Sequence, residues 1–216
     1  MTKAITILAV LLLTCAAIAQ ADIVDRVEAV VNGKVITRYE VEKAMEVEAL
    51  RRGVVSSEDS AKLRTEVLDT LIDRLLLLDE ARKFNIVQVT SGEVDKALET
   101  IKKGFASQDE FEEALKKDEM TEEELRDDIS DQILVAKYVD RRIKYFVRVT
   151  IDDQKEYYKQ NVDKFGGKSF DEVNEEVYNL LLEMATDKKL EEYLRDLRAK
   201  SEIIIKGPED QKPIVK

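Results

Sequence analysis

The residues that could do chemistry are mostly carboxylates, and they stand in runs. Residues 122–124 are three consecutive glutamates, and Asp127 and Asp128 follow shortly after them. A pair of carboxylates can serve as general acid and base, or can bind a cation through its oxygens. No EF-hand spacing accompanies these runs, and such runs are far more often solvated helix faces. They therefore predict neither a catalytic pair nor a metal site.

The other usual catalytic groups are missing from the sequence. The chain has 0 histidines, which removes the usual general base near neutral pH and the commonest transition-metal ligand. Cys15 is the only cysteine, and it falls in a segment that we expect to be cleaved off. No phosphate-binding glycine loop, dinucleotide-binding motif or nucleophile elbow occurs. The sequence predicts a protein that is not an enzyme and needs no cofactor.

The composition favours long helices with charged surfaces. Hydrophobic residues make up 44% of the chain and charged residues 38%, whereas glycine and proline occur only 7 and 2 times. High charge with few turn-forming residues is typical of helices that expose one face. The formal net charge of -11 opposes contact with phosphate backbones and anionic lipid headgroups, so nucleic acid is not expected as a partner.

Residues 1–21 predict a secretory signal peptide. Lys3 precedes an apolar run over residues 5–13 that is too short to span a bilayer, and residues 19–21 fit a cleavage site. Cleavage there leaves a chain without cysteine and without a stable membrane span. The alternative is a lipoprotein attached through Cys15, although the residue before it is bulkier than such processing normally requires. We expect a periplasmic protein.

After the signal peptide, the sequence has a hairpin pattern. The β-rich run 27–31 is followed by Asn32-Gly33, two residues that tolerate the positive φ angles of a tight turn, and by a returning run 34–36. Thr37 then begins a helix, and Glu40 completes a capping box three residues later. The sequence predicts a two-stranded hairpin leading directly into a helix that ends at a glycine.

A long apolar helix over residues 60–84 is expected to form the centre of the core. Its apolar face is wider than a surface helix requires, so several neighbours must cover it. Further helix starts are predicted where a serine or threonine precedes a glutamate by three residues. These pairs are Thr90 with Glu93, Ser107 with Glu110, Thr121 with Glu124, and Ser169 with Glu172.

The C-terminal part predicts two more helices and a strand. Residues 147–150 look extended, a helix with Tyr157 follows, and a final long helix runs from Phe170 through Leu197. Residues 203–205 form an isoleucine strand that would promote aggregation if unpaired, so we expect it to pair with residues 27–31. The predicted fold is mostly α, a helical bundle with a small antiparallel β-sheet formed by an N-terminal hairpin and a C-terminal strand. Residues 207–216 are predicted to be a flexible tail.

Several segments, taken in order, resemble the SurA-like periplasmic chaperones and related parvulin-type foldases. Residues 25–37 (DRVEAVVNGKVIT) look like the opening hairpin of that family, and residues 68–77 (LDTLIDRLLL) resemble its leucine-rich helix. Residues 149–165 resemble the linker that precedes the isomerase domain, and residues 169–205 resemble the helix and strand that follow it. The resemblance implies a helical chaperone domain at 22–149 that is completed by the helices and strand at 150–206.

One departure from the family bears on activity. Only Gly166-Gly167-Lys168 separate Phe165 from Ser169, where relatives place a whole parvulin prolyl isomerase domain. Isomerase activity is therefore not expected, and a vestigial isomerase is disfavoured. The resemblance implies an ATP-independent chaperone that binds unfolded exported or outer-membrane proteins.

Apolar residues that stand off the clearest helical core faces are the candidates for client contact, although packing is their commoner role. These candidates are Met45, Val54, Val55, Phe105, Met120, Tyr138 and Tyr145. The alternative function is a structural or adaptor protein of the cell envelope with one dedicated protein partner. In that case the same residues would line a partner interface or a homodimer interface.

Overall fold

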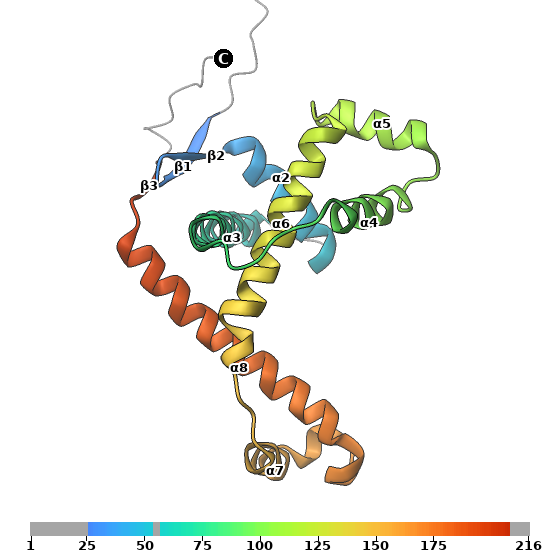
Figure 1. Ribbon diagram of the computed structural model, residues 1–216, viewed down its shortest axis with the longest axis vertical. Helices are drawn as coiled ribbons and strands as arrows, with labels where there is room; N and C mark the ends of the chain where they lie inside the picture. Colours follow the sequence, from blue (N-terminus) through green and yellow to red (C-terminus); the bar gives the residue numbers. More distant parts are fainter. Residues whose placement is uncertain (1–25, 54–56, 208–216) are drawn as a thin grey trace, which may run out of the picture.

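The computed structural model describes residues 26–53 and 57–207. The predicted signal peptide, Val54, Val55 and all but the first residue of the predicted tail therefore lie outside the described residues. The described part is mostly helical, with seven α-helices and one three-stranded antiparallel sheet (Figure 1). The predicted fold class is confirmed.

The sheet joins the two ends of the described chain. Strands β1 (Val27–Val31) and β2 (Lys34–Thr37) form the expected hairpin, with φ of 49° at Asn32 and 82° at Gly33 in its turn. Strand β3 (Ile203–Ile205) pairs with the other edge of β1, so the strand order is β2-β1-β3. The pairing of the C-terminal strand with residues 27–31 is confirmed.

The main hydrophobic core lies between this sheet and two helices. Helix α2 (Arg38–Arg52) begins with the predicted capping box of Thr37 and Glu40 and ends at Gly53, whose φ is 88°. Helix α3 (Ser57–Phe84) is the predicted central helix, and its Ile72 is fully buried. The apolar faces of β1, α2 and α3 meet in one cluster, which the C-terminal end of the chain also joins.

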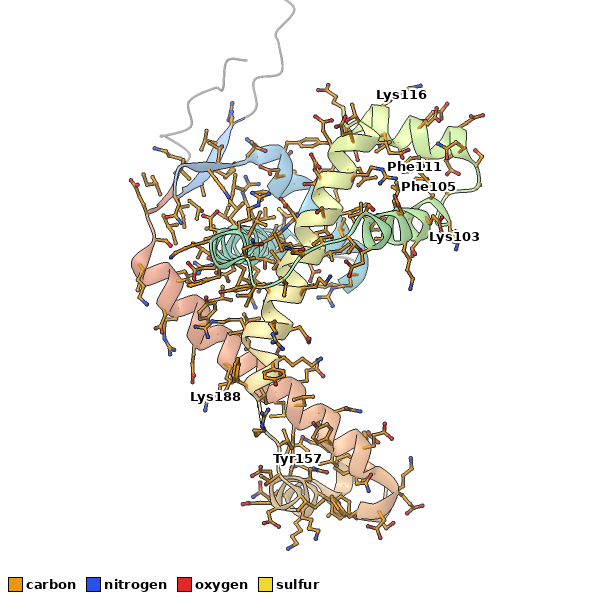
Figure 2. All side chains as sticks on the ribbon, viewed as in Figure 1. Lys103, Phe105, Phe111, Lys116, Tyr157 and Lys188 are labelled. Carbon is orange, nitrogen blue, oxygen red and sulfur yellow. The ribbon has the colours of Figure 1, made fainter. Side chains whose placement is uncertain are left out.

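A second, smaller core holds a pair of helices against the first half of α6. Helices α4 (Ser91–Lys102), α5 (Gln108–Lys117) and α6 (Glu122–Arg142) surround Phe111, which is 2% exposed. Phe105 packs edge-on against Phe111 with 5.5 Å between the ring centroids (Figure 2). α4 and α5 project from the body of the molecule as a helical hairpin (Figure 1).

The predicted capping boxes differ in how completely they form. The boxes that begin α4 and α6 are complete. At α5 the Ser107 hydroxyl accepts from the Glu110 amide at 3.2 Å, but the Glu110 carboxylate accepts from Ala106, one residue earlier than expected. The α5 box is therefore only half formed. An additional capping box, formed by Thr150 and Asp153, begins α7 and has an aspartate at the position of the expected glutamate.

The remaining elements form a third core far from the sheet. After α6 come η1 (Lys144–Phe146), α7 (Ile151–Gln160), η2 (Val162–Phe165) and α8 (Phe170–Lys200). Val173 and Val177 of α8 are buried there against Phe165 and Tyr157. The last turns of α8 then join the main core through Leu197. α8 thus runs as one helix from the distal core to the sheet (Figure 1).

Candidate binding surface

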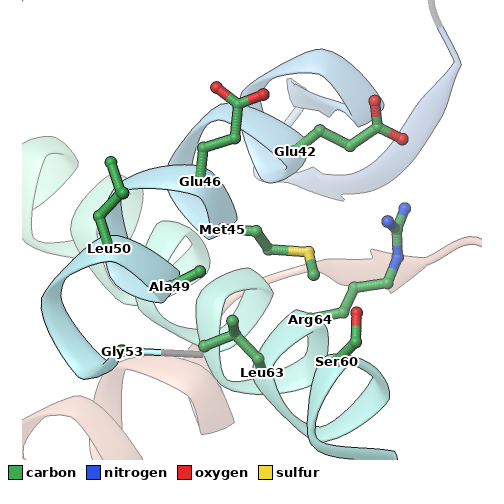
Figure 3. A pocket seen from close by; sticks show the side chains of 9 residues that line it. All are labelled: Glu42, Met45, Glu46, Ala49, Leu50, Gly53, Ser60, Leu63 and Arg64. Carbon is green, nitrogen blue, oxygen red and sulfur yellow. The ribbon is translucent and has the colours of Figure 1, made fainter. Parts of the chain in front are cut away.

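An open groove separates α2 from α3 beside the sheet (Figure 3). It has a volume of about 1020 Å³. Met45 and Ala49 lie four residues apart on α2, so they share one helix face and point toward α3. Leu63 of α3 is 3% exposed and forms the floor. The middle of the groove is therefore apolar, and the groove is built from two adjacent helices.

Leu50 makes one edge of the groove unusually apolar. Its side chain is 85% exposed, more than any other large hydrophobic residue in the described part of the chain. It lies near the Gly53 end, whereas Glu42 and Arg64 lie at the opposite end (Figure 3). An exposed leucine beside a hollow apolar floor is the arrangement that an apolar partner would cover.

The charged residues of the groove are divided between the two helices. Glu42 and Glu46 stand one turn apart on α2. Arg64 of α3 donates to the carboxylate of Glu28 at 2.5 Å, and the Glu28 side chain is only 6% exposed. The positive charge at the Arg64 end is therefore paired with a buried carboxylate of β1. On the α2 side, Glu42 is paired with Arg38 at 2.7 Å and Glu46 with Lys43 at 3.6 Å.

A network of ion pairs holds the last turn of α2 onto α3. Arg52 donates to Glu48 at 2.5 Å and to Glu66 of α3 at 2.7 Å. Hydrogen bonds from Arg51, and then from Arg52, lower the pKa of Glu48 to about 2 from its ordinary 4.5. These contacts tie α2 to α3 near the end of the groove at which α2 terminates.

A second hollow at the start of α6 is acidic. It has a volume of about 340 Å³ and is lined by Asp118, Glu119, Glu124, Asp127, Asp128 and Met120. Asp118 is already paired with Lys43 of α2 at 2.7 Å. In the described residues, no group of three or more acidic, histidine or cysteine side chains is arranged to hold a metal ion.

The structure places the candidate contact residues apart from one another. Met45 lines the α2–α3 groove, Phe105 is half-buried in the second core, and Met120 lies in the acidic hollow. Tyr145 of η1 is 57% exposed and lies beside the guanidinium of Arg141 at the end of α6. Val54 and Val55 lie outside the described residues. Of the candidates that the structure describes, only Met45 borders the groove.

Tyr138 has to be corrected, because it is a core residue with 0% exposure. Its hydroxyl bonds to the hydroxyl of Tyr193 on α8 at 2.7 Å. Tyr138 stands off the core face of α6 only if a single side of that helix is packed. α8 covers a second side of α6, and a client cannot reach this tyrosine in the folded protein.

Sequence reasoning missed most of the groove. The apolar residues Val47 and Leu50 of α2 are not among the predicted contact residues, yet they are 69% and 85% exposed. The signal that could have found the groove is the spacing of Met45 and Ala49, with Glu42 and Glu46 preceding each of them by three residues.

In the described residues, no helix is long and apolar enough to cross a membrane.

Comparison with known proteins gives consistent matches. The profile of the SurA-like N-terminal domain family matches residues 1–139. Chaperone SurA of Ralstonia nicotianae is 26% identical over 197 residues, which are 89% of this chain and 39% of that protein. Foldase protein PrsA of Clostridium botulinum is 27% identical over 139 residues, 62% of this chain and 40% of that protein. The chain thus spans about two fifths of the length of these curated relatives.

A solved structure supports the same fold. It comes from work describing the virulence factor PEB4 and the periplasmic protein Cj1289 of Campylobacter jejuni as structurally related SurA-like chaperones. It matches with a TM-score of 0.52 at 15% identity, covering 83% of this chain and 98% of its own. Because the family profile covers more than half of the 216 residues, the chain belongs to the SurA-like N-terminal domain family and is related to the SurA and PrsA foldases.

Proposed function

We propose that this protein is an ATP-independent periplasmic chaperone that binds unfolded exported or outer-membrane proteins and has no prolyl isomerase activity. The observation that carries the proposal is the α2–α3 groove, with its apolar floor, its open edge at Leu50 and its volume of about 1020 Å³. This is room for several apolar side chains of an extended segment. Family membership agrees with such a role.

The side chains of the groove suit varied clients. Met45 is unbranched and polarisable, so it adapts to apolar groups of different shapes. The carboxylates of Glu42 and Glu46 favour segments in which basic residues flank the apolar ones. No nucleotide-binding motif occurs in the sequence, so release relies on weak and rapidly exchanging binding. A tight complex that dissociates slowly would contradict this part of the proposal.

The short connection between η2 and α8 supports the proposal that isomerase activity is absent. Phe165 ends η2 and Phe170 begins α8, so only four residues separate them. In the family that the sequence resembles, a parvulin domain occupies this place. The periplasmic location rests on the predicted signal peptide at residues 1–21.

Light scattering tests the proposal directly. An outer-membrane protein is diluted from urea with and without the chain, and we expect suppressed aggregation at near-stoichiometric ratios. Leu50→Glu should weaken client binding by about tenfold, since burying a leucine contributes roughly 1.5 kcal/mol or more. Because Leu50 is exposed, this change should leave the fold intact.

Val47→Glu is the matched control. Val47 is on the same helix and is 69% exposed, but it does not line the groove. Equal losses for both variants would exclude the groove as the client site. No suppression by the unmodified chain across a wide concentration range would reject the chaperone and favour an adaptor with one dedicated partner.

A further inference from the structure

Two aromatic rings are exposed on the short turn that follows α6, beside α8 (Figure 1). Tyr145 and Phe146 of η1 are 57% and 56% exposed, whereas Ile143 and Val147 on either side of them are buried. The turn thus directs its aliphatic side chains inward and its aromatic ones outward. The two rings pack edge-on with 5.2 Å between their centroids, so together they form one apolar surface.

Three cations surround these rings. The guanidinium of Arg141 on α6 lies over the Tyr145 ring, 4.8 Å from its centroid. Arg148 donates to the Tyr145 carbonyl at 2.8 Å, and Lys189 of α8 donates to the Phe146 carbonyl at 3.2 Å. The contacts bring α6, η1 and α8 together at one place. We call these three cations and two rings the η1 cluster.

The cations of the η1 cluster are not neutralised by carboxylates. Among the described residues, none of the three forms an ion pair, and their partners are an aromatic ring and backbone carbonyls. Asp140, next to Arg141 in the sequence, is paired with Lys144 at 3.5 Å instead. Asp153 accepts from Thr150 at the start of α7. A local excess of positive charge therefore stands on a chain whose net charge is -11.

Each cation of the cluster keeps N–H donors for a ligand. A guanidinium stacked on a ring keeps the edge of its plane accessible, so Arg141 can hold a carboxylate while it stays over Tyr145. Arg148 uses only Nη1 for its two carbonyl partners, and Lys189 uses one of the N–H bonds of its ammonium group. All three side chains are exposed. A ligand with carboxylates beside an apolar side chain would satisfy both the cations and the rings.

A short acidic segment suits this cluster better than an extended polyanion. Charges in water are screened beyond roughly 10 Å at about 0.1 M salt, so a short peptide responds mainly to the local cations. A lipid bilayer or a nucleic acid extends farther and would meet the acidic remainder of the chain. The charge distribution therefore favours a protein segment as the ligand.

We propose that the η1 cluster binds short acidic protein segments in which an aromatic or large aliphatic side chain stands next to carboxylates. The carboxylates pair with Arg141, Arg148 and Lys189, and the apolar side chain covers the two rings. None of these residues lines the α2–α3 groove, so the cluster is a separate contact site. The binding itself is independent of the proposed function, but its use on unfolded clients rests on that function.

Fluorescence anisotropy with the full chain tests the proposal. The probe is a rhodamine-labelled peptide in which glutamates flank two phenylalanines. Arg141→Gln with Lys189→Gln should weaken its binding by at least about threefold, since each exposed ion pair contributes modestly. Lys103→Gln with Lys116→Gln is the matched control, because it changes the net charge equally on the α4–α5 hairpin (Figure 2). Equal losses for the two double variants, or no binding to the unmodified chain, would overturn the proposal.

Two altered peptides separate the charges from the apolar contact. Replacing the glutamates by glutamines and, in a second peptide, the phenylalanines by serines should each weaken binding by at least about threefold. If either altered peptide binds as tightly as the original, the stated ligand class is wrong.

Amide and methyl NMR locates the bound peptide. Titration should shift the amide resonances of Tyr145 and Phe146 and leave the Met45 methyl in the groove unchanged. A shift at Met45 without one at η1 would place the peptide in the groove and reject the proposed site. Vesicles containing phosphatidylglycerol that bind through Arg141 and Lys189, when the peptide does not, would assign the cluster to a membrane surface and equally reject it.

The same measurements keep this site distinct from the proposed function. A chain that binds the acidic peptide at η1 but does not suppress aggregation would reject the chaperone and leave the site in place. A chain that suppresses aggregation but does not bind the peptide would retain the chaperone and overturn the site.

Discussion

Arg198 on α8 holds the C-terminal part of the chain against α3 through hydrogen bonds. Its Nε donates to the carboxylate of Asp73 at 2.6 Å, its Nη1 to the carboxylate of Asp69 at 3.1 Å, and its Nη2 to the Asp69 carbonyl at 3.0 Å. The hydrogen bond to Asp73 is the main cause that raises the pKa of Arg198. Replacing this residue therefore tests how firmly α8 and β3 are held.

The expected magnitude follows from the exposure of the partners. A hydrogen bond to a charged group contributes roughly 1.5–3 kcal/mol when desolvated, and an exposed ion pair roughly 0.2–1 kcal/mol. The side chains of Arg198 and Asp73 are 30% and 26% exposed, and that of Asp69 is 48% exposed. Arg198→Met should therefore lower the free energy of unfolding by about 2 kcal/mol, or the melting temperature by roughly 4–8 °C.

Urea unfolding followed by far-UV circular dichroism measures this loss. Arg195→Met is the matched control, because Arg195 is exposed on the same helix, and we expect a change of no more than about 0.5 kcal/mol. Arg198→Lys should recover less than half of the loss, since an ammonium group cannot reproduce the planar fork. Equal losses for the methionine variants at 198 and 195 would refute the reasoning.

Two further predictions concern a buried hydroxyl pair and an acid-sensitive helix start. The Tyr193 hydroxyl donates to Glu80 at 3.1 Å, so Tyr138 donates to Tyr193. Tyr193→Phe should lower the free energy of unfolding in urea by roughly 1–3 kcal/mol, because it leaves the buried Tyr138 hydroxyl without a partner. Tyr138→Phe should lower it by about 1 kcal/mol or less. The opposite order would contradict this donor assignment. Hydrogen bonds from Lys137, and then from the capping threonine, lower the pKa of Glu93 to about 2 from its ordinary 4.5. Its folded-state pKa is depressed, so its contribution is complete above about 4.5 and is lost as the pH falls toward about 2. The protection factors of the amides at the start of α4, which are corrected for the intrinsic exchange rate at each pH, should fall over that range. In Glu93→Gln they should already be low at neutral pH. An acid-dependent loss of protection that persists in this variant would refute the assignment.

The local features of this fold can be predicted from the sequence because their causes are local. The turn at Asn32 and Gly33 depends on two residues that accept positive φ, and the helix starts at Thr37 and Thr121 depend on residues three positions apart. The β1–β3 pairing was predictable for another reason. An isoleucine strand at residues 203–205 needs a partner, and β1 is a buried apolar strand with a second edge available.

The groove and the state of Tyr138 could not be predicted, because both depend on packing between distant segments. The apolar pattern of α2 does not show which of its apolar residues α3 leaves uncovered, so it could not single out the exposed Leu50. Tyr138 is covered by α8, which begins more than 30 residues later in the sequence and contacts it through Tyr193. The pattern of α6 alone could not show this. Periodicity identifies the apolar faces of a helix, but not how many neighbours share them.

The pairing of β1 with β3 also determines the order in which the protein can be completed. The amide of Glu202 donates to the side chain of Asn32 across a sequence separation of 170 residues. A chain that folds progressively from its N-terminus can form the β1–β2 hairpin and the early helices first, but one edge of β1 stays open until β3 is available. A stalled or clipped chain would keep that edge and could pair through it with other strands. The three residues of β3 therefore cover an edge of β1 that the hairpin alone leaves exposed.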